Sequence, residues 1–289
     1  MKRTNVVISV VTYGRIKKWV GLMRNLRQVR KNCPDSIDLS FLFIEDSKSR
    51  FEIRLIKGFI ASIFNRNKFK YLEGYDNLGQ SRDFAVRNLP LDVDFFGFID
   101  DDDRYDPKVL QVLEVFLTQS NSLSPSIINF GMSGNFHITQ PPYKGYPERK
   151  NRLRLWDDTS NFGCIPSCAS FIRLSDWRDS GLGFGKNIPS EESTPLMIFT
   201  YYSKVVAHVG INLMFRNRAK TSLVRDLSIY DRSVISNNIK QHVLNLRYYT
   251  GSKENFDYLY KIFRYNYGSY LKSHGASYVD EIFKEIENE

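Results

Sequence analysis

The sequence has few cysteines, no long apolar run and no block of basic residues. Three cysteines, at irregular spacings, are too few for a disulfide framework. No apolar stretch reaches the roughly 18 to 20 residues that cross a bilayer, and the N-terminal segment has no small-residue signal-peptide cleavage site. Five consecutive Lys or Arg residues never occur, so a polybasic tail for nucleic acid is not indicated. These absences favour a cytoplasmic protein with no nucleic-acid partner.

The composition is that of a basic globular protein. The chain has 289 residues, of which 42% are hydrophobic and 14% aromatic, with a net charge of +9. This length suits one large domain, or one domain with an appendage, and it is enough for a large hydrophobic core. The basic excess has two interpretations at this point, namely pairing with phosphate groups or an ordinary solvated surface.

The first 120 residues alternate between short β-branched or aromatic runs and longer amphipathic stretches. This alternation predicts an α/β fold with a mostly parallel sheet and helices on both faces. Ligands of such sheets bind at the carboxyl ends of the strands. We expect strands near residues 5–12, 39–44, 68–72 and 95–99, and helices near residues 16–29, 51–64 and 80–88 and from Asp106-Pro107 onward.

After about residue 120 the pattern loosens into short segments rich in Gly, Pro, Ser and Asn, which predict substrate loops. A strand is expected at residues 169–173 and a helix at 193–202, on either side of a Gly-rich loop at 181–185. From residue 228 the sequence becomes helical and aromatic. We therefore expect a domain over residues 1–225, with halves 1–120 and 121–225, and a helical C-terminal appendage over residues 226–289.

The strongest chemical signal is the segment FFGFIDDDDRYDP, in which an apolar strand ends in four carboxylates, Asp100 to Asp103. Adjacent carboxylates repel one another, and a hard divalent cation resolves this, because Mg²⁺ and Mn²⁺ prefer oxygen ligands and share them with substrate phosphates. The alternative is an acidic turn that caps the helix expected at Pro107, since a positive helix end favours aspartate.

This segment resembles the DxD motif of the inverting glycosyltransferases of family 2, which have the GT-A fold. The resemblance covers about residues 4 to 220, through short motifs in the family's order. It implies that Asp102, with Asp100, binds Mn²⁺ or Mg²⁺ at the diphosphate of a nucleotide-sugar donor. It also implies that Asp100 lies against the ribose and that Asp101 and Asp103 support the site.

Two further motifs resemble the family's nucleotide pocket. The segment VVISVVTYGR is similar to the opening strand and its turn, which implies that Thr12, Tyr13 and Arg15 line the pocket. The segment FLFIEDSKS is similar to the turn that ends the second strand, which makes Asp46 the residue that holds the base. Here Glu45 replaces the first Asp of the family's pattern.

The segment NLGQSRDFAVRN resembles the family's Asn-x-Gly-x-Ser motif, with Asn77 and Gly79 in the matching places. A glycine lets the backbone approach a ligand, and the N-terminus of the following helix favours an anion. The family's arginine is shifted in this sequence. Either Arg82 or Arg87 is therefore the cation expected at the phosphates, unless both are surface residues of the helix.

The segment NIPSEESTPLM matches the place of the family's catalytic base, an acidic residue at a helix start. The pair is Glu191-Glu192, and register with the family favours Glu192. A neighbouring carboxylate raises the pKa of a base toward its working range. The alternative is a capping box, with Ser190 or Ser193 as the cap and acidic residues in the first turn.

The resemblance implies transfer of a sugar, with inversion, from a nucleotide diphosphate donor, most commonly UDP in this family, to a hydroxyl of a saccharide acceptor. The implied setting is bacterial surface polysaccharide synthesis, such as that of O-antigen, with an acceptor on a polyprenyl diphosphate. Two other functions stay open: a sugar-phosphate nucleotidyltransferase, and a nucleotide- or carbohydrate-binding protein without catalysis. The aromatic and basic C-terminal region suits peripheral contact with a membrane. The alternative is that these aromatic residues belong to the core.

Overall fold

The computed structural model describes most of the chain. The described residues are 3–12, 16–45, 50–64, 69–73, 78–117, 125–134, 167–184, 193–203, 206–216, 231–273 and 275–288.

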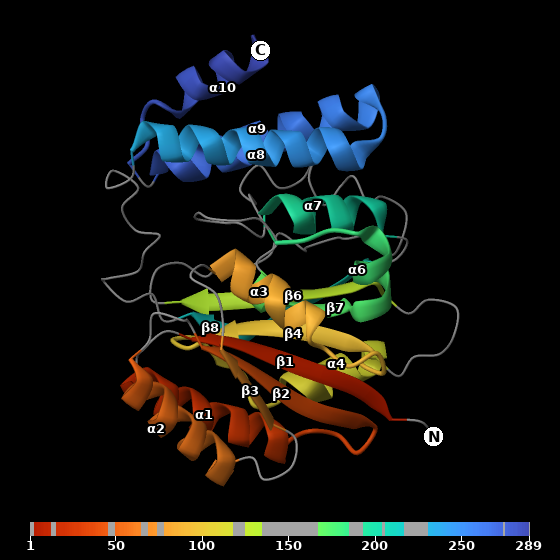
Figure 1. The fold of residues 1–289 in the computed structure, drawn as a ribbon. Coiled ribbons are helices and arrows are strands. Elements are labelled where there is room, and N and C mark those ends of the chain that lie inside the picture. The colour runs from red at the N-terminus through yellow and green to blue at the C-terminus, as the bar shows by residue number, and fades with distance from the viewer. Residues whose placement is uncertain are drawn as a thin grey trace.

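A single sheet lies at the centre of the molecule (Figure 1), with strand order β3-β2-β1-β4-β7-β6-β8-β5. Strands β1 to β4 are parallel to one another, β7 is antiparallel to both of its neighbours, β6 and β8 are parallel, and β5 is antiparallel to β8. The strands are β1 Thr4–Thr12, β2 Ile37–Glu45, β3 Phe69–Glu73, β4 Phe95–Asp100, β5 Arg104–Tyr105, β6 Ile127–Gly134, β7 Ser170–Arg173 and β8 Val206–Arg216.

Helices cover both faces of the sheet. Because successive side chains of a strand point to opposite faces, each strand contributes to two cores, one on each face. On β1, Val6, Ile8 and Val10 face one core, and Val7 faces the other. The core of Val6 is closed by α1 (Ile16–Lys31), α2 (Phe51–Phe64) and α4 (Val109–Leu117), which lie below the sheet in Figure 1. The opposite core is closed by α3 (Leu78–Arg87), α6 (Leu174–Ser180) and α7 (Ser193–Tyr202).

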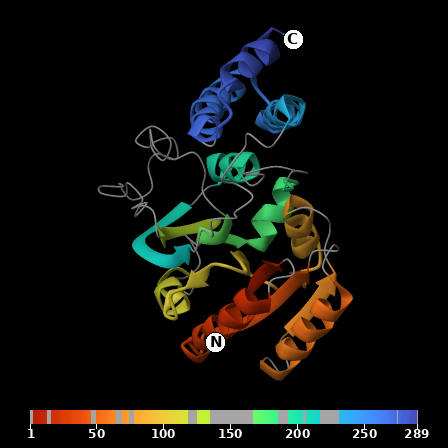
Figure 2. The ribbon, with the colours of Figure 1, turned by 90° about the vertical axis from the view of Figure 1, so that its left-hand side faces the viewer.

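The C-terminal region forms a further helical layer, beyond α7 and far from α1 and α2 in both views (Figures 1 and 2). It consists of α8 (Arg232–Thr250), α9 (Lys253–Ser273) and α10 (Val279–Glu287). Its aromatic residues are divided between core and surface. Phe263 and Tyr267 are buried in the same core as α7, whereas Tyr248 and Tyr265 are 80% and 56% exposed. For Phe263 and Tyr267, the core alternative is confirmed.

The predicted α/β class, with a mostly parallel sheet flanked by helices and a helical C-terminal region, is confirmed. Several boundaries differ from the expected ones by one or two residues, and α4, for example, begins at Val109 and not at Pro107. The carboxylate of Asp106 accepts a hydrogen bond from the N–H of Lys108, and its carbonyl accepts one from the N–H of Val109, so residues 106–108 form a turn before the helix. Within the described part of the chain, no helix is long and apolar enough to span a bilayer.

Candidate active site

Three neighbouring parallel strands end at one edge of the sheet and bring the candidate residues together. Thr12, at the end of β1, is paired with Glu45 at the end of β2, and Val11 is paired with Asp100 at the end of β4. The register thus sets the first two nucleotide motifs beside the acidic segment, as expected for the ligand edge of an α/β sheet.

The four carboxylates after β4 alternate between solvent and protein. The Asp100 and Asp102 side chains are 24% and 17% exposed, whereas the residues Asp101 and Asp103 are 0% and 2% exposed. The turn is closed by a hydrogen bond of 3.1 Å from the N–H of Asp103 to the carbonyl of Asp100. The two residues expected to meet the metal and the nucleotide are therefore the two that solvent reaches.

The sequence gives Arg82 and Arg87 as alternatives for the cation at the phosphates, and Arg82 is the one that lies at the acidic turn. Its Nη2 is 3.3 Å from Oδ1 of Asp100, and its guanidinium carbon lies 5.6 Å from the centre of the Phe98 ring. Arg82 is 1% exposed, whereas Arg87, one and a half turns further along α3, is exposed. Gly79, in the first turn of the same helix, is buried. Helix α3 thus presents one buried cation to the acidic turn.

Lys18 and Arg104 are two cations of this site that the sequence analysis missed. Lys18 Nζ lies 2.9 Å from Oδ2 of Asp102. Arg104 donates through Nη1 to the carbonyl oxygens of Asp101 and Asp103, and through Nη2 to the carbonyl of Lys18 at 3.2 Å. Burial lowers the pKa of Arg104 and the neighbouring aspartates raise it. The guanidinium therefore ties the acidic turn to the first turn of α1.

A buried ion pair underlies the ends of β1 and β2. Lys57 of α2 lies 2.8 Å from Oε2 of Glu45 and donates to Oγ1 of Thr12 at 2.6 Å, and the hydroxyl of Thr12 lies 3.2 Å from Oε2 of Glu45. The side chains of Lys57 and Glu45 are fully buried, and Lys57 also lies 5.4 Å from the centre of the Trp19 ring. Thr12 is thus part of the support beneath the site. Sequence offered no signal for Lys57, since a lysine in an amphipathic helix is normally on the solvent side.

Six of the predicted site residues lie outside the described residues. They are Tyr13, Arg15, Asp46, Asn77, Glu191 and Glu192. The described residues before the Glu191-Glu192 pair and those after it are each attached to other helices by hydrogen bonds.

The loop before the Glu191-Glu192 pair is bound to α3. The N–H of Phe184 donates to Oδ1 of Asp83 at 2.6 Å, and the hydroxyl of Tyr249, from α8, donates to the carbonyl of Gly181 at 3.0 Å. Burial raises the pKa of the Asp83 carboxyl to about 6, although the Phe184 N–H and the charge of Arg87 both lower it. The loop is therefore held by the Asp83 carboxylate, whose ionised form is disfavoured by burial.

The segment after the pair is bound to the C-terminal region. Thr194, the second residue of α7, is buried, and its Oγ1 makes a hydrogen bond with Nδ1 of His242 in α8. The His242 ring packs against Phe263 and Tyr267, with centroid separations of 5.3 and 5.2 Å. Burial lowers the pKa of His242 to about 4, so the ring is neutral at pH 7. The C-terminal helices therefore hold the start of α7.

The acidic turn fits a divalent cation of the kind shared with a phosphate ligand. No group of three or more His, Cys, Asp or Glu side chains in the described ranges is arranged to hold a metal alone. A Mg²⁺ or Mn²⁺ ion in a phosphate site needs only one or two carboxylates, with phosphate and water oxygens as its other ligands. Asp100 and Asp102, both partly open to solvent, provide that donor set.

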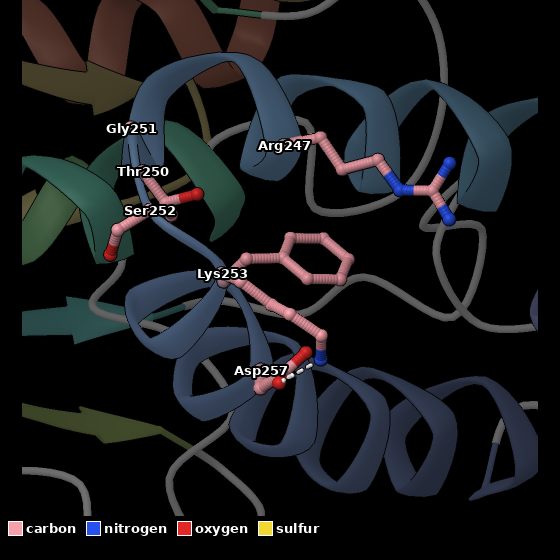
Figure 3. Close-up of a pocket in the computed structure, with 7 residues that line it drawn as sticks. Arg247, Thr250, Gly251, Ser252, Lys253 and Asp257 are labelled. Atoms are coloured by element: carbon pink, nitrogen blue, oxygen red, sulfur yellow. Dashed lines mark hydrogen bonds and ion pairs between the residues drawn. The ribbon is translucent and has the colours of Figure 1, made fainter.

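A surface cavity of about 460 Å³ lies elsewhere, where α8 ends and α9 begins (Figure 3). Its lining includes Arg247 of α8 and an ion pair along α9 between Lys253 and Asp257, at 2.6 Å. All of its lining residues come from α8, α9 and the link between them. This cavity is therefore separate from the acidic turn.

Comparison with solved structures gives clear matches to glycosyltransferases. S. aureus TarS 1–349 in complex with UDP-GlcNAc matches with a TM-score of 0.67 and 12% sequence identity, over 94% of this chain and 73% of that one. The same TarS fragment in complex with UDP matches with a TM-score of 0.65, 14% identity and coverages of 96% and 73%. The mannosyltransferase PcManGT from Pyrobaculum calidifontis, in complex with GDP-Man and Mn²⁺, matches with a TM-score of 0.59, 10% identity and coverages of 96% and 74%.

The chain has a glycosyltransferase fold. At these identities the likeness concerns the fold. No family model and no curated protein sequence matches the chain.

Proposed function

We propose that this protein is a metal-dependent inverting glycosyltransferase of family 2 with the GT-A fold, and that it uses a UDP-sugar as donor. The observation that carries the proposal is the acidic turn at the ligand edge of the sheet. Asp100 and Asp102 are accessible there, while Asp101 and Asp103 are buried. The fold match to proteins bound to UDP-GlcNAc, UDP, and GDP-Man with Mn²⁺ supports the same interpretation.

In this proposal, Asp102 and Asp100 hold the cation together with the donor diphosphate. When bound, Mn²⁺ or Mg²⁺ would neutralise negative charge on the departing diphosphate. Arg82 fixes the Asp100 carboxylate, and Arg104 fixes the backbone of the turn, so both ligands are positioned before the donor arrives. Lys18 pairs with Asp102 in the free protein, and its ammonium group would add positive charge beside a bound diphosphate.

The remaining residues of the donor pocket are assigned from the family resemblance. Thr12, Tyr13 and Arg15 line it, Asp46 holds the base, and Asn77 and Gly79 approach the diphosphate. In the structure, the Thr12 hydroxyl is held by Lys57 and Glu45 beneath the site, and Gly79 is buried in the first turn of α3.

Glu192 is assigned as the base that takes the proton from the acceptor hydroxyl, with Glu191 as the neighbouring carboxylate. In an inverting transfer the new bond from that oxygen to the anomeric carbon forms as the bond to the diphosphate breaks on the opposite face. The described residues on either side of this pair are held by the hydrogen bonds of Phe184 and Thr194. Residues 1–225 form the catalytic domain in this proposal, with the donor half at 1–120 and the acceptor half at 121–225, and residues 226–289 form the appendage that holds α7.

The acceptor in this proposal is a saccharide on a polyprenyl diphosphate, in bacterial surface polysaccharide synthesis. This assignment rests on the resemblance. Sugar transfer and donor hydrolysis should be measured over a panel of nucleotide sugars, with and without Mn²⁺. We expect metal-dependent turnover of a UDP-sugar.

The test variants are Asp102→Asn and Glu192→Gln, with Asp179→Asn, an exposed carboxylate of α6, as the control. We expect both test variants to lose transfer and to unfold at the wild-type temperature, and the control to remain active. Because Glu192→Gln keeps the cation site, it should still bind UDP with Mn²⁺. Wild-type activity in either test variant rejects that residue's role, and donor binding with no turnover in the wild type would favour the non-catalytic alternative.

A further inference from the structure

Helix α2 has its apolar face outside. Phe51, Leu55, Phe59 and Ile63 recur at every fourth residue, so they form one stripe along the helix. Their exposed fractions are 62%, 57%, 67% and 54%, and Ile56 beside them is 45% exposed. Monomeric proteins seldom expose large apolar side chains in a continuous patch, and such a patch marks a surface that binds something.

The inner side of α2 explains this inversion. Over residues 51–63, the part of the helix whose side chains are described, the fully buried residues are Lys57, which pairs with Glu45, and Ala61. The Lys57–Glu45 ion pair, the Ala61 methyl group and the partly buried Ile60 attach the helix to the core, and the exposed side chains of the outer stripe contribute little to that attachment. The outer stripe is therefore available to a ligand.

The neighbouring helix α1 is strongly basic. Its sequence contains six Lys or Arg residues and no Asp or Glu. Lys18 faces Asp102 and Arg30 lies 4.8 Å from the centre of the Phe41 ring. The other four, Lys17, Arg24, Arg27 and Lys31, are exposed at spacings of seven, three and four residues, which put them on one side of the helix.

The two helices lie side by side on the same face of the sheet, opposite the C-terminal layer (Figures 1 and 2). We propose that the outer surface of α1 and α2 binds an anionic phospholipid bilayer. The exposed side chains of α2 enter the boundary between headgroups and acyl chains, and the exposed Lys and Arg of α1 meet the lipid phosphates. This combination of an apolar stripe and a basic stripe is typical of interfacial helices.

Charge favours lipid over a second copy of the chain as the occupant. Two copies packed through this surface would offer the basic stripe of α1 only one carboxylate from the two helices, Glu52 of α2, and uncompensated like charges in an interface oppose association. An anionic bilayer provides both the apolar phase and the opposite charge. Helix α2 has 14 residues, too few to span a bilayer, so it would lie in the plane of the surface.

The test is co-sedimentation of the whole protein with vesicles, without sugar donor, so the outcome is independent of the proposed transferase activity. One set contains phosphatidylcholine alone, and the other contains phosphatidylcholine with about one third phosphatidylglycerol. We expect binding to the anionic vesicles that weakens as salt is raised. The variant Leu55→Ser/Phe59→Ser should bind at least about tenfold more weakly, since two large side chains lose their burial in lipid.

Matched control variants distinguish binding through the α1 and α2 surface from non-specific binding of the protein to lipid. The variant Leu91→Ser/Tyr248→Ser removes two side chains that are 91% and 80% exposed elsewhere and should bind as the wild type does. Arg24→Gln/Lys31→Gln should weaken binding to anionic vesicles about thirtyfold, at roughly 1 kcal/mol for each of the two charges, whereas Lys261→Gln/Lys284→Gln, in the C-terminal layer, should not. All of these side chains are exposed, so the melting temperatures should stay unchanged.

Three results would overturn the proposal. The first is equal binding of Leu55→Ser/Phe59→Ser and the wild type. The second is a wild-type protein that binds neither kind of vesicle. The third is a wild-type protein that is dimeric by light scattering and becomes monomeric in Leu55→Ser/Phe59→Ser, which would assign the surface to a second copy.

Discussion

The Oγ1 atom of Thr194 lies 2.5 Å from Nδ1 of His242, deep in the core between α7 and α8. This bond joins the C-terminal helices to the helix that follows the Glu191-Glu192 pair. Because His242 is fully buried and its pKa is lowered to about 4, the bond exists with a neutral ring.

The His242 pKa predicts acid destabilisation. The unfolded chain binds a proton at its ordinary value near 6.5, and the folded protein resists it. The stability due to the neutral ring is therefore fully present above pH 6.5 and is lost as the pH falls toward 4, by about 3 kcal/mol in all. His242→Gln should flatten the dependence of the unfolding free energy on pH in this window, as measured by urea unfolding at several pH values. An unchanged slope would contradict the assignment.

Asp83 acts in the same pH window with the opposite sign. Its pKa is raised to about 6, so the folded protein holds this proton more tightly than the unfolded chain does. Its contribution to stability is present below pH of about 4 and is lost as the pH rises to about 6. The loss amounts to about 1 to 2 kcal/mol after a discount for solvent screening of a partly exposed group.

Asp83→Asn should therefore stabilise the protein at pH 7, because the amide oxygen still accepts from the Phe184 N–H but carries no charge. It should also steepen the rise of stability with pH, whereas His242→Gln flattens it. The opposite slopes make each variant a control for the other. Destabilisation by Asp83→Asn at pH 7 would show that the charge itself holds the loop.

Apart from the two-residue strand β5, the elements up to α4 follow from the periodicity of the sequence. The alternation Val6, Ile8, Val10 has the period of a strand, and residues 51–64 have the period of an amphipathic helix. Periodicity does not state which side of that helix faces inward. The buried Lys57 requires a carboxylate on another strand, and the pairing with Glu45 arises only when β1, β2 and α2 are assembled.

In the candidate site, too, local sequence patterns predict some residues and only the assembled fold shows the others. The sequence predicts Asp100 to Asp103, because four carboxylates follow an apolar run. It leaves Arg82 and Arg87 as alternatives for the cation, and only the position of α3 shows that Arg82 lies at the acidic turn. The side chains that fix these residues come from afar: Lys18 is 84 positions from Asp102, and His242 is 48 from Thr194. No local pattern marks such partners. Strands β6 and β8 also escaped prediction in detail, since their Gly, Ser and Asn residues weaken the strand signal.

The Lys57–Glu45 pair predicts a large cost for removing one partner alone. Lys57→Met should destabilise the protein by about 3 to 5 kcal/mol, because it leaves a buried carboxylate without its cation. Lys57→Met/Glu45→Gln should recover a substantial part of this loss, since the amide is neutral and still accepts from Thr12. Lys253→Met, which removes an exposed pair with Asp257, is the control and should cost less than about 1 kcal/mol. Urea unfolding measures all three, and equal losses in the single and double variants at position 57 would contradict the pairing argument.

Gly21 and Gly58 form a matched pair for testing the support of the acidic turn. Both lie inside helices, where alanine is ordinarily more stable than glycine by about 0.5 to 1 kcal/mol. A Cβ at Gly58 would meet nothing within 4 Å, whereas a Cβ at Gly21 would lie 2.6 Å from Nη2 of Arg104. Gly58→Ala should therefore raise the unfolding free energy.

Gly21→Ala should lower the unfolding free energy by about 1 to 2 kcal/mol, because the displaced guanidinium of Arg104 loses its bonds to the turn carbonyls. The same displacement loosens the backbone between Asp100 and Asp103, so Mn²⁺ should bind more weakly to Gly21→Ala than to Gly58→Ala in a titration followed by electron paramagnetic resonance. A Gly21→Ala protein that gains stability as Gly58→Ala does, with the same Mn²⁺ affinity, would mean that Arg104 does not hold the turn.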